Sequence, residues 1–301
     1  MWLIYSLIAA LCFGLRGVMY QWTSRKPANR NLMLFGTFFM GALASLVAIG
    51  ASGQAWTAAS WIGCIMGVLS FIANSAMYRG YAVGKASLVA LFTGLPPVVV
   101  VCLAYLLWGQ TLSPLQLAAF LAIVAGILII RYSSSISLDT LKGIQWAIIA
   151  LFGFGLNDTT STWAMRLDAA LFPTMFFMFA TGSALFGFSW IRERLSARSH
   201  LNTLTAASRE ESAAAAETGG WSARRTIGWG MVVGTTNFAG MYFILHAFAQ
   251  GIAGLVSAVT SLNVLIILVY ASLFLKERFT RKEAIGGICA LAGVMTLHLA
   301  G

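Results

Sequence analysis

The chain of 301 residues is 59% hydrophobic and only 9% charged, and its formal net charge is +10. A soluble protein of this length could not cover its surface with so few charged side chains, so the composition excludes a soluble globular protein. The basic excess does not indicate nucleic-acid binding either. Its residues lie in short segments between apolar stretches, where Lys and Arg report membrane orientation.

Apolar stretches long enough to cross a bilayer occur throughout the chain, since a spanning helix needs about 20 such residues. The first half predicts helices over 2–22, 31–51, 60–82, 87–108 and 114–131. The second half predicts helices over 143–164, 172–191, 226–249, 254–275 and 282–300. The long polar break near 193–224 is read as a surface helix or a mobile connector. The predicted fold class is therefore an all-α integral membrane protein with ten transmembrane helices.

The distribution of Lys and Arg predicts an orientation for these helices. All basic residues except Arg16 and Arg166 lie in the segments that follow odd-numbered spans. The positive-inside rule then places the odd-numbered loops in the cytoplasm and both termini outside. We expect a multi-pass protein of the cytoplasmic (inner) membrane.

The two halves of the sequence resemble each other at fixed offsets. The stretch AVGKASLVALFTGLPPVVVVCLAYLL (82–107) aligns without a gap to AQGIAGLVSAVTSLNVLIILVYASLF (249–274), 167 positions later. The first helices align at an offset of 141, which pairs Gly14 with Gly155 and Trp22 with Trp163. We predict two repeats, 1–135 and 136–301, with the polar loop inside the second.

Five helices in each repeat have a consequence for function. Because five is odd, the second copy must enter the membrane the other way up, so a pseudo-two-fold axis in the membrane plane would relate the halves. Such inverted five-helix repeats enclose a cavity near the midplane and have two similar arrangements, one open to each side. The repeat therefore favours a carrier that works by alternating access.

One pattern occurs twice, at 86–129 and 253–297. It consists of a helix that starts with small residues, an apolar helix, a turn and the motif G…AG(I/V). With KERFTRKEAIGG (276–287), the two copies resemble the ten-helix EamA-like members of the drug/metabolite transporter superfamily. The first copy has GQTLSPLQ where those proteins commonly carry an acidic residue. The resemblance implies a transporter and specifies no substrate. Members are often drawn with both termini in the cytoplasm, whereas the charge distribution here predicts the opposite, and we follow the charges.

Two charges inside predicted spans are the leading site candidates. Asp158 is the one acid clearly inside a span, and Arg16 aligns with its neighbour Asn157 at the offset of 141. Intramembrane charges normally face the bundle interior and pair. We predict that Arg16 and Asp158 pair in the empty state and that substrate or a proton competes for the pair; the alternative is a purely structural salt bridge. The resemblance adds weight, because small multidrug-resistance relatives carry an essential acid on the first helix.

Seven further polar residues in the third, eighth and ninth predicted helices could complete the cavity: Asn74, Tyr78, Arg79, Asn237, Tyr242, His246 and Asn263. The alternative is that they lie at the membrane–water interface, where Arg, His and Tyr are common. The offset of 167 aligns Arg79 with His246.

Other functions are disfavoured by the motifs. The sequence has no HExxH, GxSxG or P-loop, and its three histidines are far apart, so we expect no enzyme, no metal site and no cofactor. We predict a secondary active transporter of an amino acid or similar small solute, with protons as a candidate coupling ion. A lipid-carrier flippase and a non-transporting membrane assembly protein are the alternatives.

Overall fold

The computed structural model describes residues 1–24, 26–83, 89, 92–131, 143–203, 220–274 and 280–300. Every regular element in these ranges is helical, which agrees with the predicted all-α class. The helices of the first half are α1 (Trp2–Ser24), α2 (Arg30–Ser52), the 3₁₀ helix η1 (Ala58–Trp61), α3 (Ile62–Val83), α5 (Pro96–Trp108) and α6 (Pro114–Arg131). Those of the second half are α7 (Ile144–Arg166), α8 (Leu171–Thr203), α10 (Ala223–Gln250), α11 (Ala253–Thr260), α12 (Asn263–Phe274) and α13 (Arg281–Ala300).

Six of these helices are long and apolar enough to cross a membrane by length and composition: α1, α2, α3 (with η1), α8, α10 and α13. Large apolar side chains also stay exposed on the outside, for example Leu106, Phe274, Ile288 and Met295. In water such a surface would be unfavourable, whereas lipid tails solvate it. The chain is therefore an integral multi-pass membrane protein.

Two predicted helices are broken in the structure. The expected continuous helix over 254–275 is interrupted at Ser261–Leu262, and the one over 87–108 has a turn at Thr93–Gly94 before α5 begins. Pro96 cannot continue a preceding helix because it lacks a backbone N–H. In the second half, the Thr260 and Ser261 hydroxyls donate to backbone carbonyls one turn earlier, a contact that often bends helices.

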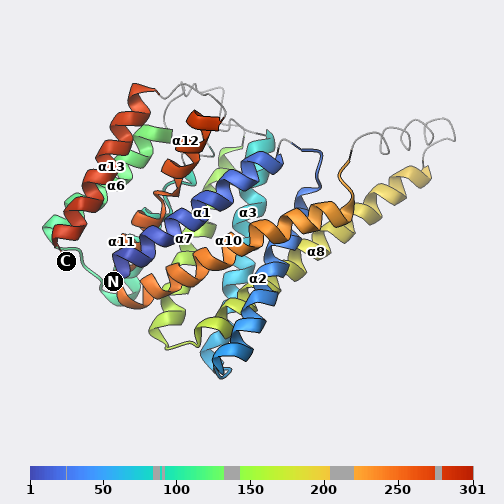
Figure 1. The fold of residues 1–301 in the computed structure, drawn as a ribbon, viewed down its shortest axis with the longest axis horizontal. Coiled ribbons are helices and arrows are strands. Elements are labelled where there is room, and N and C mark those ends of the chain that lie inside the picture. The colour runs from blue at the N-terminus through green and yellow to red at the C-terminus, as the bar shows by residue number, and fades with distance from the viewer. Residues whose placement is uncertain are drawn as a thin grey trace.

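The helix α8 is longer than predicted. It continues past the expected end at 191 to Thr203, so it covers the first part of the segment we assigned to the 193–224 connector. Figure 1 shows this end projecting from the body of the bundle. The rest of the connector, to residue 219, lies outside the described residues.

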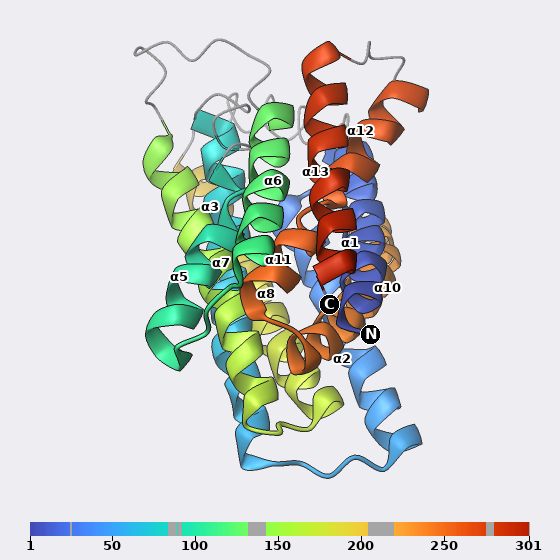
Figure 2. The same ribbon diagram turned by 90° about the vertical axis from the view of Figure 1, so that its left-hand side faces the viewer.

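Helix packing repeats itself when the two halves are exchanged. The pair α6 and α13 packs side by side, as Figures 1 and 2 show, and so does the pair α2 and α8. The contact of α1 with α10 has its counterpart in that of α7 with α3. The contact of α1 with α12 likewise corresponds to that of α7 with α5.

Close helix contacts at glycines also occur at equivalent positions of the two halves. A Cβ atom on Gly41 would clash with the Phe179 ring, and one on Gly182 would clash with the Phe38 ring. These are equivalent contacts, because the offset of 141 takes Gly41 to Gly182 and Phe38 to Phe179. Only glycine allows helices to approach so closely.

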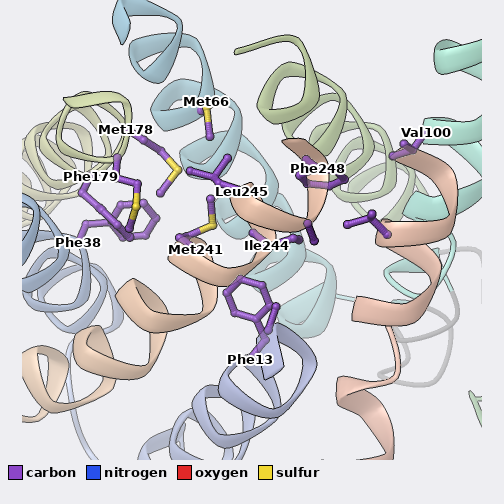
Figure 3. Close-up of a cluster of buried hydrophobic side chains, with 14 of the residues drawn as sticks. Phe13, Phe38, Met66, Val100, Met178, Phe179, Met241, Ile244, Leu245 and Phe248 are labelled. Carbon is purple, nitrogen blue, oxygen red and sulfur yellow. The ribbon is translucent and has the colours of Figure 1, made fainter. Parts of the chain in front are cut away.

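The described core has three clusters, of which the smallest holds Ile62, Ala164 and Ala169, and the largest contains α10 at its centre. Met241, Ile244, Leu245 and Phe248 of this helix pack against side chains of α1, α2, α3 and α8, as Figure 3 shows. A smaller cluster joins α6, α13 and the broken pair α11–α12. The polar residues described below therefore lie at helix contacts within an apolar bundle.

Candidate functional site

Most buried hydroxyl groups in the bundle are satisfied by their own helix. Thr37, Ser45, Thr159 and Ser161 each donate to the carbonyl four residues earlier. Such bonds carry no information about a site. Hydrogen bonds between side chains of different helices are more informative, and three of them involve predicted site residues.

The first joins Arg16 on α1 to Asn237 on α10. Arg16 donates from Nη1 to Oδ1 of Asn237 at 2.5 Å, and its guanidinium lies 4.6 Å from the centre of the Phe13 ring. Asn237 is buried, whereas Arg16 is half-buried. An amide oxygen and an aromatic ring therefore contact the guanidinium of Arg16.

The second joins Asn157 on α7 to Ser70 on α3, where the Ser70 hydroxyl donates to Oδ1 of Asn157 at 3.2 Å. Asn157 is the repeat equivalent of Arg16 at the offset of 141, and Ser70 is the equivalent of Asn237 at 167. The same pair of positions is therefore bonded in both halves. Asn74 extends this cluster by donating to the Ser70 carbonyl at 2.7 Å.

The third involves Asp158, the next residue along α7. Its Oδ2 accepts a hydrogen bond from the Ser257 hydroxyl at 2.6 Å. Ser257 lies on the short helix α11, four residues before the break at Ser261. Discontinuous helices at the site are a recurring feature of secondary transporters, because their ends offer unpaired backbone groups to a ligand.

The predicted ion pair between Arg16 and Asp158 does not form. Both side chains are described, and each has a neutral partner on another helix rather than the opposite charge. Arg16 bonds to the third helix of the other half, whereas Asp158 bonds to the fourth helix of its own half, so neither charge contacts the other. Both remain half-buried.

Arg79 and His246 also occupy equivalent environments. The Arg79 guanidinium lies 4.9 Å from the centre of the Trp146 ring, and the His246 ring lies 5.5 Å from that of Tyr5. The offsets take Arg79 to His246 and Tyr5 to Trp146, so the two contacts correspond. A cation on an aromatic face is favourable and leaves the guanidinium N–H groups available.

The remaining predicted residues make other contacts. The ring of Tyr78 lies 5.0 Å from the Arg30 guanidinium. Tyr242 packs 4.4 Å from His246 between ring centres, and its carbonyl lies 2.9 Å from Nδ1 of His246. Asn263 is half-buried and begins α12, at the position equivalent to Pro96, which begins α5.

Two cavities lie at opposite ends of α2 and α8. The larger, about 650 Å³, adjoins Asn31, Ser75 and Ser189 together with charged residues. The smaller, about 280 Å³, is lined by six residues: Ala48, Phe172, Phe238, Ala239, Tyr242 and Phe243. All six have their repeat equivalents in the wall of the larger cavity, in the order Ser189, Asn31, Phe71, Ile72, Ser75 and Ala76.

Sequence reasoning missed Ser70 and Ser257, which complete two of the three interhelical bonds. A signal for Ser70 was present, because it is the repeat equivalent of the predicted Asn237. Ser257 had none, since serine is common in such helices. In the described part of the chain, no group of His, Cys, Asp and Glu is arranged to hold a metal ion.

Comparison with known proteins agrees with the resemblance seen in the sequence. The model of the EamA-like transporter family matches residues 1–132 and 141–299. A solved protein described as "Crystal structure of protein" has a TM-score of 0.73 and covers 100% of this chain and 99% of its own length. It is only 15% identical, so the likeness shows the fold alone. No curated protein matches the chain.

Proposed function

The chain belongs to the EamA-like transporter family, a family of transporters rather than enzymes, and we propose that it is a secondary active transporter of a small metabolite. It works by alternating access in the cytoplasmic membrane, with ten spanning helices and the odd-numbered loops in the cytoplasm. The sequence holds no P-loop, so a gradient of an ion or of a second solute supplies the energy.

The observation that carries this proposal is the exchange of equivalent contacts between the halves. Many of the close approaches have a counterpart at the same offsets, as for Gly14 against Ile266 and Gly155 against Val99. Contacts of this kind support an inverted pair of repeats around a pseudo-two-fold axis. In that arrangement, exchanging the conformations of the halves turns an opening on one side into the same opening on the other.

The two cavities are consistent with this cycle. They lie at opposite ends of α2, because Asn31 and Ala48 are 17 residues apart and a helix rises about 1.5 Å per residue. They are built from equivalent positions but differ in size. We assign the two cavities to opposite sides of the membrane.

Arg16 and Asp158 form the proposed substrate and coupling centre. Each is held by one neutral side chain, a partner that a charged ligand or a proton can replace at small cost. Binding therefore does not require a strong ion pair to be broken. The substrate contacts and the use of protons belong to this proposal.

Reconstitution tests the proposal and separates it from its alternatives. The purified protein in liposomes is expected to exchange a radiolabelled amino acid or small carboxylate from a metabolite panel faster than protein-free liposomes. A fluorescent lipid reporter, followed by dithionite quenching, should show no protein-dependent lipid movement. Lipid movement without solute exchange would identify a flippase, and neither activity would favour an assembly protein.

A further inference from the structure

The larger cavity carries a cluster of cations that the fold itself does not require. Arg30, Arg79 and Arg192 line it, from the start of α2, the end of α3 and the outer part of α8. Their repeat equivalents are Leu171, His246 and Ala51, and the smaller cavity has no charged residue in its wall. Because the two cavities are built from equivalent positions, the helix packing does not explain why only one of them carries arginines.

In the described part of the chain, no carboxylate forms an ion pair with the three guanidinium groups. Arg30 and Arg79 rest on the rings of Tyr78 and Trp146, at 5.0 and 4.9 Å. The Nε atom of Arg30 is buried and has no hydrogen-bond partner. A buried donor without an acceptor is costly, so this group favours an anion beside it.

The one acid that lines the cavity, Glu193, is hydrogen-bonded to two amide side chains. Glu193 accepts hydrogen bonds from Asn31 at 2.6 Å and from Asn29 at 3.3 Å, one on each carboxylate oxygen. These amides hold the carboxylate and leave the arginines available. With three arginines and one glutamate, the charged residues of the cavity wall are positive on balance.

We propose that this cavity binds a small organic carboxylate with an apolar body before it passes to the Arg16–Asp158 centre. Guanidinium groups bind carboxylates through paired, charge-assisted hydrogen bonds. The wall between the arginines is apolar and aromatic, with Phe71, Ile72 and Trp146, which suits a branched or aromatic carboxylate. The inference names the substrate class of the proposed transporter and rests on it, but binding is measurable without transport.

Titration calorimetry on the purified protein in detergent tests the charge requirement with three probes of similar size: benzoate, benzamide and benzylammonium. Micelles without protein supply the blank. Benzoate is expected to bind about 10-fold more tightly than either other probe, the effect of one charge-assisted contact. Equal affinities for benzoate and benzamide would overturn the proposal.

Variants locate the site. Arg30→Gln, Arg79→Gln and Arg192→Gln should each weaken benzoate binding about 5- to 10-fold. The matched control is Arg194→Gln, since Arg194 lies two residues from Arg192 on α8 but rests on Trp190 and does not line the cavity. A loss with Arg16→Gln but not with Arg79→Gln would place the anion at the centre and refute a site in the cavity.

A second measurement needs no variant and so does not depend on variant folding. Phenylglyoxal modifies accessible arginines, and mass spectrometry reports each site. Benzoate should slow the modification of Arg30, Arg79 and Arg192 several-fold and leave Arg194 unaffected. Equal modification with and without benzoate would contradict the proposal. Benzoate binding without any solute exchange would instead refute transport and leave the anion site standing.

Discussion

The Oδ1 atom of Asn237 lies 2.5 Å from Nη1 of Arg16, so the arginine of the first helix is bound to α10 and not to the acid of α7. The same two positions in the other half hold Asn157 and Ser70, again bonded. The same contact is therefore present in both copies, with a charged partner in one and only neutral partners in the other.

Removing the acceptor should destabilise the protein. In Asn237→Ala, the guanidinium of Arg16 loses its side-chain acceptor within the bundle, a loss of about 1–3 kcal/mol. Thermal unfolding in detergent measures it. Thr235→Ala is the matched control, because Thr235 is exposed on the same helix and its hydroxyl bonds its own backbone. Equal midpoints for the two variants would show that the Arg16–Asn237 bond contributes nothing.

Replacing the carboxyl of Asp158 should stop transport without unfolding the protein. Asp158→Asn keeps an acceptor for Ser257 but removes the charge that a proton or cationic group would use. We expect the solute flux in proteoliposomes to fall about 10-fold or more, with an unchanged thermal midpoint. Asp168→Asn is the control, since it lies in the α7–α8 turn at φ +50°, which Asn tolerates. Wild-type flux in Asp158→Asn would remove Asp158 from the mechanism.

The contact of α6 with α13 should be sensitive to a single methyl group. A Cβ atom on Gly286 would lie 2.6 Å from the Gly126 carbonyl oxygen, a backbone atom that cannot move aside cheaply. We expect Gly286→Ala to cost about 1–3 kcal/mol through overpacking. The adjacent Gly287→Ala meets only Leu265 at 3.5 Å and should be nearly neutral. The two variants compared by thermal unfolding report on this helix contact, and equal midpoints would mean that α6 and α13 are not so closely packed.

Cysteine labelling should show the halves threading the membrane in opposite directions. Lys26 and Leu167 are repeat equivalents at the offset of 141, and both are exposed. In a variant without the four native cysteines, Leu167→Cys is expected to react with an impermeant maleimide in intact cells. Lys26→Cys should react only after permeabilisation. Labelling of both from one side would disprove the inverted repeat, and a reversed pair of results would reverse the orientation predicted from charge.

Hydropathy alone determined the class of this protein and most of its helices. The predicted span 31–51 is the helix Arg30–Ser52, and 282–300 is Arg281–Ala300. An apolar segment in lipid forms a helix because each backbone N–H and C=O group must find its hydrogen-bond partner within the segment. The breaks before Pro96 and Asn263 were missed, since apolar length carries no information about where a chain turns inside the bundle.

The sequence identified residues of the candidate site, but it did not show which side chains bond to one another. Internal offsets made Arg16 equivalent to Asn157 and Arg79 equivalent to His246, and those equivalences hold in the environments observed. Equivalence predicts that two residues have similar surroundings. It does not predict that they touch, because residues exchanged by a two-fold operation meet only near its axis. Arg16 bonds to α10 and Asp158 bonds to α11, so the helix packing, and not the alignment, decided that each of these charges would have a neutral partner.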